Sequence, residues 1–409
     1  MKRYKSSIVI ALSIILILNT GCTAKLKSKY TIKAKALTES VQNISSADNK
    51  TAMKMLNATY DLNKEKNTVI SPISLSTVLA LTQNGAAGST KEEMLKAIGM
   101  EGLTDAVINE EYKNIIANYN SVDALKLRMA NSIWIEKSTN IKNSFINMGK
   151  DYYEAEVSSV DFTKNKTTNN INSWISDHTA GKIKKIVDKF DEDTAMVLVN
   201  TVYFKGDWRV PFEKKATTEK TFINYDSSKS SVKMMNGTVS VDYFKGNDFR
   251  VVRLPYKDDN FGMYIFLPNE GTSINDFMEE MNIDNWNKWK SAFSQKSLIV
   301  EIPKFHIEFE QMLNNMLKGF GMRSAFEPGA DFSNMSPENN LYINFVKQKC
   351  FIDVDEKGTE AAASTALSAS KSAANLQDDE KFIADRPFIY VMEDKKTGII
   401  LFMGAVVKL

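Results

Sequence analysis

The sequence predicts an α+β fold, in which helices and strands are segregated along the chain rather than alternating. Segments with helical periodicity dominate the first half of the 409 residues, and strand-like segments dominate the second half. Apolar residues make up 43% of the chain and charged residues 25%, which are ordinary values for a folded protein with a sizeable core. No internal repeat and no long linker precede residue 355, so one folded unit is expected.

The first predicted helix begins at Pro72. Residues 67–70 are a short strand-like run, Ser71 is placed to be an N-cap, and Pro72 suits the first helical position because no N–H is needed there. Further helix-like segments follow at 90–98, 106–118, 142–154, 167–178 and 309–320. Strand-like segments lie at 127–135, 195–204, 239–246, 249–254, 260–267, 297–303, 350–355, 387–393 and 398–407.

The N-terminus has the features of a signal peptide. Three basic residues, Lys2, Arg3 and Lys5, precede an eleven-residue apolar run at 8–18. That run is too short for a transmembrane helix, which needs about 20 residues. We therefore expect residues 1–21 to be a signal peptide.

The residues after the apolar run resemble the cleavage site of bacterial lipoproteins, in which a cysteine takes a diacylglycerol and becomes the mature N-terminus. Gly21-Cys22 carries this resemblance, although Asn19 stands where the motif usually has leucine. The resemblance implies a lipid on Cys22, a flexible tether at 22–45, and a location outside the cytoplasm at a membrane surface. Secretion without a lipid is the alternative.

The charge balance and the cysteine count limit the partners and the cross-links that this chain can have. Without residues 1–21 the chain has 49 Lys and Arg against 50 Asp and Glu, so no nucleic-acid partner is expected. Only two cysteines exist, which rules out a disulfide framework, and Cys350 lies in an apolar-rich string where a buried small side chain is expected.

The residues needed for catalysis are scarce, so we expect neither an enzyme nor a metal or cofactor site. His178 and His306 are the only histidines; the first is predicted to lie at a helix end and the second on an exposed strand face. There is no His-Glu-x-x-His, no Gly-x-Ser-x-Gly and no Walker loop. The glycines of 319–324 lack the third glycine of a dinucleotide motif and indicate a helix C-cap instead.

Three strings resemble the motifs of one family, the serpins. They are the central-strand motif Asn200-Thr-Val-Tyr-Phe-Lys-Gly-Asp-Trp208, the hinge motif at 355–363, and the C-terminal strands at 386–390 and 401–404. The matches fall in family order and cover residues 46–409. The resemblance implies a serpin domain over that range, with three β-sheets, eight to nine helices and an exposed reactive-centre loop at about 356–386.

The resemblance also implies a function. Serpins are suicide inhibitors of serine proteases, and some also inhibit cysteine proteases: the target cleaves the loop, stays attached as a covalent acyl complex, and is carried along as the loop enters the main sheet. We expect a monomer that acts in this way. The alternative is a non-inhibitory serpin-fold protein that binds or scaffolds a partner.

The loop sequence can be tested for its ability to become a strand. The hinge, at 356–363, contains Glu356, Gly358, Thr359, Glu360, Ala361, Ala362 and Ala363. From Thr359 onwards one set of alternate residues is mostly apolar or threonine, and the other set carries the charge and most hydroxyls. Gly358 lies where the chain must turn, and no proline interrupts 359–370. The loop therefore has the pattern of a strand that is buried on one face.

Family spacing places two further sites. The reactive bond, counted from Glu356, is Ser372-Ala373, with Lys371-Ser372 as the second choice because the loop is a few residues longer than is common. Ser372 predicts elastase- or subtilisin-like targets and Lys371 trypsin-like ones. The family's polar cluster under the opening sheet matches Ser71, Ser74, Asn200 and Gln348, and Trp208 is expected to pack at the top of the sheet. Many family members have histidine where this chain has Gln348, so no pH dependence is expected from that site.

Overall fold

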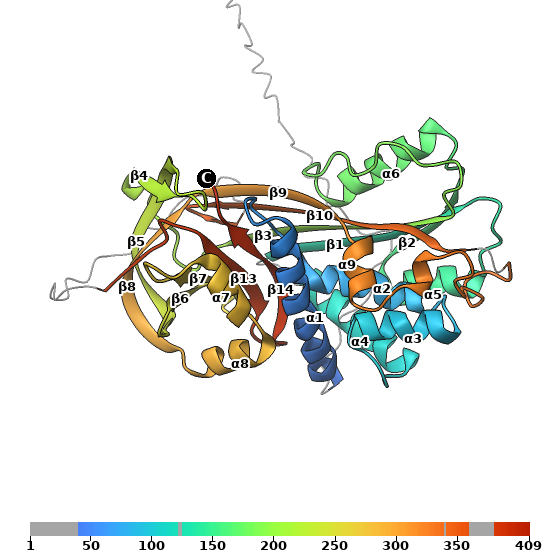
Figure 1. The fold of residues 1–409 in the computed structure, drawn as a ribbon, viewed down its shortest axis with the longest axis horizontal. Coiled ribbons are helices and arrows are strands. Elements are labelled where there is room, and N and C mark those ends of the chain that lie inside the picture. The colour runs from blue at the N-terminus through green and yellow to red at the C-terminus, as the bar shows by residue number, and fades with distance from the viewer. Residues whose placement is uncertain (1–39, 122–124, 339–340, 360–379) are drawn as a thin grey trace, which may run out of the picture.

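The computed structural model describes residues 40–121, 125–338, 341–359 and 380–409, which form nine α-helices around two hydrogen-bonded sheets (Figure 1). The helices are α1 (Ser40–Leu62), α2 (Pro72–Gln83), α3 (Gly88–Ala97), α4 (Asp105–Ser121), α5 (Asn143–Tyr153), α6 (Asn165–His178), α7 (Ile274–Glu280), α8 (Ile283–Ser291) and α9 (Asn314–Gly319). The strands are β1 (Leu125–Glu136), β2 (Glu156–Val160), β3 (Met196–Asp207), β4 (Thr218–Ile223), β5 (Lys229–Lys245), β6 (Phe249–Pro255), β7 (Phe261–Pro268), β8 (Ser294–Pro303), β9 (Phe305–Met312), β10 (Ile343–Asp355), β11 (Gly358–Thr359), β12 (Lys381–Ile383), β13 (Phe388–Asp394) and β14 (Ile399–Val406).

One sheet has six strands in the order β2-β1-β3-β11-β10-β9. Helix α6 covers one of its faces, where Val197 and Val199 of β3 pack with Ile171 and Ile175 (Figure 1). The alternate residues of β3 point the other way, into the main core that the sheet shares with α2. Because both faces are covered, the central strands are apolar on both sides.

The second sheet runs β12-β8-β5-β6-β7-β13-β14, with β4 paired to β5 off this path. Strand β5 is 17 residues long and pairs in turn with β4, β8 and β6. The two smaller sheets implied by the family resemblance are therefore joined through β5 into one hydrogen-bonded network.

The helix predicted at 309–320 is wrong in its first part. Residues 305–312 form β9, and only 314–319 are helical. Burial alternates along the start of β9, with Phe305 and Ile307 buried and His306 and Glu308 exposed, so the period-two pattern continues past residue 309. Pairing with β10 along its whole length then holds this segment extended.

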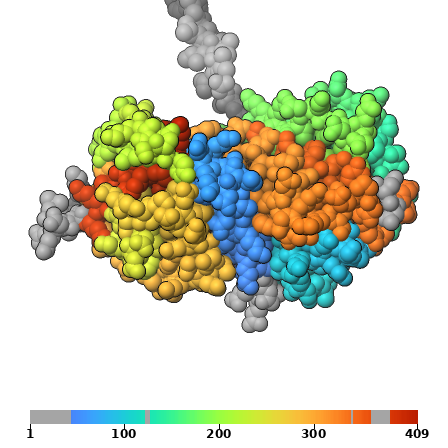
Figure 2. Space-filling model, in the orientation of Figure 1, coloured from blue at the N-terminus to red at the C-terminus, as the bar shows by residue number. Residues whose placement is uncertain are grey.

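Helix α1 was not predicted, and it begins inside the segment assigned to a tether. Residues 40–45 of that segment, 22–45, belong to α1, which packs against β14 and α2. Figure 2 shows α1 in blue as a band across this face of the molecule, with α7 and α8 on one side and α9 on the other. The signal peptide and Cys22 lie outside the described residues. Among those described, no helix is long and apolar enough to cross a membrane.

Candidate functional site

The six-stranded sheet is split at one end. Strands β3 and β10 pair in parallel from Met196 and Ile343 as far as Tyr203 and Phe351. Beyond that point they separate, and β11 lies between them: Gly358 and Thr359 pair with β3 on one side and with β10 on the other, antiparallel to both. The start of the loop thus already occupies the gap through which a further strand could enter.

Three backbone contacts hold the chain just before β11. The Trp208 N–H donates to Lys357 O at 2.8 Å, the Trp208 indole Nε1 donates to Asp355 O at 3.0 Å, and the Phe212 N–H donates to Glu356 O at 2.8 Å. Trp208 is 2% exposed and directly follows β3, at the end where the sheet is split. Its indole is therefore a fixed support for the hinge.

The side chain of Glu356 ties the hinge to the second sheet. It is 4% exposed, its Oε2 lies 2.8 Å from Lys304 Nζ, and its Oε1 accepts from Thr217 Oγ1 at 2.9 Å. Burial by itself raises the pKa of Glu356, but the hydrogen bonds from Lys304 and Thr217 outweigh it, so the pKa lies below the usual 4.5. The carboxylate is charged at neutral pH, and its ion pair with Lys304 depends on that charge.

Gly358 and Thr359 are fitted closely into the gap. A Cβ added to Gly358 would lie 2.1 Å from Gly206 O, so no other residue fits there without moving β3. The Thr359 side chain is fully buried, and its hydroxyl is 2.8 Å from the Tyr256 hydroxyl, whose ring stacks on Trp208 at 4.7 Å. Thr359 therefore faces the core side of the sheet.

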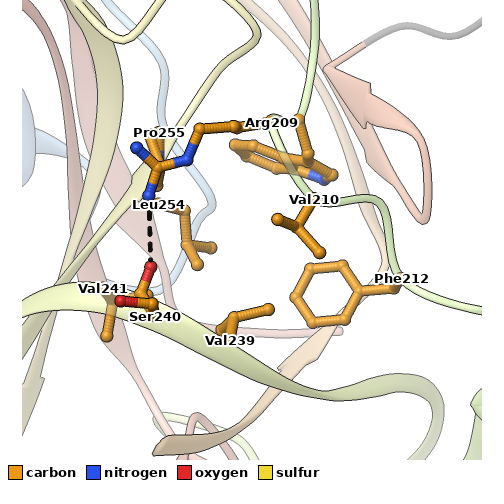
Figure 3. A pocket seen from close by; sticks show the side chains of 9 residues that line it. Arg209, Val210, Phe212, Val239, Ser240, Val241, Leu254 and Pro255 are labelled. Atoms are coloured by element: carbon orange, nitrogen blue, oxygen red, sulfur yellow. Dashed lines mark hydrogen bonds between the residues drawn. The ribbon is translucent and has the colours of Figure 1, made fainter. Parts of the chain in front are cut away.

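A shallow apolar recess lies beside these supports, with about 270 Å³ of space when it is counted out to its open mouth. Figure 3 shows Phe212, Val239 and Leu254 on its wall, with Arg209 reaching across to Ser240, whose backbone oxygen accepts from Arg209 Nη2 at 3.4 Å. Trp208 also lines it. Trp208 and Phe212, which hold the hinge, thus border this recess.

A buried polar cluster bridges β3 and β10 half-way down the sheet. Gln348 Nε2 donates to Asn200 Oδ1 at 2.7 Å and to Ser71 O at 2.9 Å, while Gln348 Oε1 accepts from the Ser71 N–H at 3.1 Å. Asn200 Nδ2 donates to Ser74 O at 3.0 Å and to Asn131 Oδ1 at 2.6 Å, and it also contacts Ser74 Oγ. The structure therefore brings together all four predicted residues of this cluster.

Two features of the cluster were not predicted. Asn131 of β1 is 2% exposed and belongs to it, and an asparagine in the middle of the predicted strand 127–135 was the signal in the sequence. Ser71 occupies the N-cap position of α2 as predicted, but its hydroxyl makes no cap and donates instead to Leu401 O of β14 at 2.7 Å. The cluster thus links α2 to both sheets, at a point where β3 and β10 are still paired.

Other predicted site residues do not join this site. Residues 360–363 of the hinge and the bond at 371–373 lie outside the described residues. His178 stacks on Trp174 at the end of α6, and His306 is exposed on β9. Within the described ranges no group of three or more potential metal ligands occurs. Cys350 is fully buried, which raises the pKa of its thiol.

The chain is similar to known proteins over almost its whole length. A family model described as "Serpin (serine protease inhibitor)" matches residues 46–409. An uncharacterized serpin-like protein of Methanosarcina acetivorans is 33% identical, over 99% of this chain and 98% of its own. Leukocyte elastase inhibitor of Xenopus laevis is 33% identical over 89% of this chain and 99% of its own.

Solved structures show the same likeness. The thermophilic serpin tengpin in its native state superposes with a TM-score of 0.83 at 29% identity, covering 93% of this chain and 97% of that one. Human thyroxine-binding globulin superposes with a TM-score of 0.83 at 26% identity, covering 90% of this chain and 99% of that one.

Proposed function

The chain belongs to the serpin family, and on that basis we propose that it is an irreversible suicide-substrate inhibitor of serine proteases. A target protease would cleave the loop that follows Thr359 and remain bound to it as an acyl-enzyme. The cut loop would then enter the sheet between β3 and β10 as a new strand and carry the protease with it. The protein would be consumed in this reaction and would act as an inhibitor, not as an enzyme.

The position of β11 is the observation that carries this proposal. Gly358 and Thr359 already pair with both β3 and β10, in the place that the first residues of an inserting strand would take. Continued insertion requires the parallel pairing of β3 with β10 to open from the same end. It also requires the hydrogen bond between Gln348 and Asn200, which crosses the opening, to break.

The register of β11 predicts where each later residue would go. Thr359 lies between Gly206 of β3 and Val354 of β10. If the same antiparallel register continues, Thr365 comes to lie between Asn200 and Gln348. A threonine hydroxyl donates one hydrogen bond and accepts others, so it can bond to the amides on both sides after their direct contact is lost. The same register directs the apolar set of the loop toward the core, the side that Thr359 faces.

The target depends on the bond that is cut. We propose Ser372-Ala373, which suits elastase- and subtilisin-like proteases, with Lys371-Ser372 and trypsin-like proteases as the second choice. Relatives named leukocyte elastase inhibitor support the first. We propose cysteine proteases as a further class of target.

We also propose that the protein acts as a monomer outside the cytoplasm. Cys22 would carry a lipid that holds it at a membrane surface, after removal of residues 1–21. Release without the lipid is the alternative, since Asn19 departs from the lipoprotein motif.

A non-inhibitory role as a binding or scaffold protein is the second candidate. The likeness to thyroxine-binding globulin favours it, because a protein with this fold and that name was solved with its ligand. In that case cleavage of the loop would have no consequence for a protease.

A thermal scan before and after cleavage within the loop separates the two candidates. For the inhibitor, the cleaved chain gains a central strand and its melting temperature rises sharply. For a binder whose loop is merely cut, the melting temperature is unchanged, and that result would contradict insertion.

A further inference from the structure

A second recess, of about 250 Å³ counted to its open mouth, lies next to the apolar recess and shares Arg209 and Pro255 with it. Its walls are polar rather than apolar. Arg209, Arg253 and Lys395 bring three cationic groups to it, and Asp242 and Asp259 bring two carboxylates. These groups leave the recess with one excess positive charge.

Arg253 is the most unusual of these residues because it is buried and incompletely bonded. The residue is 2% exposed, and its Nε has no hydrogen-bond partner. Its Nη2 donates to the Asp259 backbone oxygen, but its Nη1 lies 3.4 Å from Asp242 Oδ2 and 3.7 Å from Asp259 Oδ1, which are long for charge-assisted hydrogen bonds. A buried donor without a partner is costly, and such a group in a native protein commonly indicates an absent water or ion.

The backbone is adapted to hold this guanidinium. Gly262 of β7 lies beneath it, and a Cβ there would come within 2.5 Å of Arg253 Nε. The ring of Tyr264 lies 5.9 Å from the guanidinium carbon. Arg253 is therefore held in place by packing and by the bond from Nη2 to Asp259 O, while its Nε has no partner and its Nη1 has only long contacts.

Further unused donors surround the same space. Across the described ranges, neither the Lys395 ammonium nor the Gln295 amide, both at the recess, makes a hydrogen bond or ion pair. Arg209 pairs with Asp259 at 2.8 Å, but the Asp259 side chain is 58% exposed and can turn out to solvent. Donors outnumber the acceptors that could satisfy them.

From this surplus of donors we infer that the recess binds a small oxyanion of the phosphate or sulfate type. Such an anion presents oxygens in several directions and can accept from Arg209, Arg253 and Lys395 together, whereas a carboxylate offers two oxygens in one plane. On binding, the anion replaces the Asp259 carboxylate on Arg209. Asp242 remains with Arg253.

The site is placed to act on the hinge. Arg209 follows Trp208, whose N–H and indole hold Lys357 and Asp355, and the Arg209 N–H donates to Pro255 O at 2.9 Å. An anion that fixes Arg209 against Arg253 would also fix Trp208, and with it the hinge backbone at Asp355 and Lys357. Any effect of this on inhibition rests on the proposed function, but the binding itself does not.

Isothermal titration calorimetry of the full chain tests the site, at constant ionic strength set with sodium chloride. The probes are inorganic phosphate and, as a phosphomonoester, O-phosphoserine. We expect saturable binding of phosphate at one site per chain. Binding of both probes would indicate that the natural ligand can be a phosphate ester, and binding of phosphate alone would indicate a free anion.

Three variants and a matched control identify the recess as the place of binding. Lys395→Gln and Arg209→Gln each remove one charge-assisted hydrogen bond and are expected to weaken binding about tenfold. Asp259→Asn removes the competing carboxylate and is expected to tighten binding. Lys396→Gln changes the same charge one residue away, outside the recess, and should leave binding unchanged.

Several outcomes would overturn the inference. They are the absence of saturable binding, an equal loss in Lys395→Gln and Lys396→Gln, and weaker binding in Asp259→Asn. None of these variants alters the buried Arg253, so a failure to fold does not confuse the result. Because no protease is used, failure here leaves the proposed inhibition untouched.

Discussion

Glutamate at position 361 should convert the protein from an inhibitor into a substrate. The register of β11 brings Ala361, on insertion, between Phe204 of β3 and Ile352 of β10. Both of these side chains are 1% exposed and belong to the main core. A carboxylate at 361 would therefore enter an apolar space with no partner.

The size of the effect follows from that burial. An uncompensated buried charge costs about 3–5 kcal/mol, and each 1.4 kcal/mol corresponds to a factor of about ten. Insertion of the Ala361→Glu loop should thus be slowed by a factor of about 100 or more. The acyl-enzyme would be hydrolysed before the protease is trapped.

Ala362→Glu is the matched control, because it makes the same change on the opposite face of the strand. The register places residue 362 beside Tyr203 and Phe351, where Lys182 Nζ lies 5.4 Å from the Phe351 ring. A cation is therefore close to a glutamate at 362, and the loss should be much smaller.

The assay is the number of inhibitor molecules consumed for each protease molecule inactivated, measured by titrating protease activity. Ala361→Glu should be cleaved with almost no inactivation, and Ala362→Glu should stay close to the parent chain. Equal behaviour of the two variants, or full inhibition by Ala361→Glu, would refute the assigned register.

Three further predictions concern the pH dependence of stability and of the inhibition rate. Burial raises the pKa of Asp48 to about 7, against the hydrogen bond from Tyr112, so the folded state binds a proton that the unfolded state loses near pH 4. Stability should fall as pH rises from about 4 to 7, by up to about 4 kcal/mol, and Asp48→Asn should melt higher than the parent at pH 8 but not at pH 4.5. Gln348 does not titrate, so inhibition rates corrected for the protease should be flat between pH 5.5 and 7.5, whereas Gln348→His should introduce a pH dependence; a marked change in the parent chain would count against this account. The net lowering of the Glu356 pKa means that its bond to Lys304 stabilises the hinge at neutral pH and is lost as pH falls through that lowered pKa. Glu356→Gln should abolish this acid step in a thermal scan and lower the melting temperature at pH 7; an unchanged acid step would assign it to another group.

Much of this site could be predicted because short-range patterns specify it. The alternation after Thr359 predicts a strand with one buried face, and Thr359 itself is fully buried against Tyr256. Gly358 was expected where the chain turns, and the structure adds the reason, a close approach to Gly206 O. Local sequence is sufficient here because a strand and a turn depend on neighbouring residues.

Other parts could not be predicted because they depend on contacts between distant segments. The Glu356 carboxylate is held by an ion pair with Lys304 and a hydrogen bond from Thr217, and no local sequence pattern connects these two residues to the hinge. The hydroxyl of Ser71 bonds across 330 positions to Leu401 instead of capping its helix. Strand pairing likewise decided that residues 309–312 extend β9, in place of the predicted helix.

The most direct test of the central claim is to mix the protein lacking residues 1–21 with subtilisin, elastase and trypsin in turn. Each mixture is run on a denaturing gel, and the released C-terminal peptide is weighed by mass spectrometry. We predict a covalent band near the summed masses of protein and protease, together with a peptide of residues 373–409. Clean cleavage in the loop with no such band, across a wider panel of proteases as well, would contradict the claim that this chain traps its target.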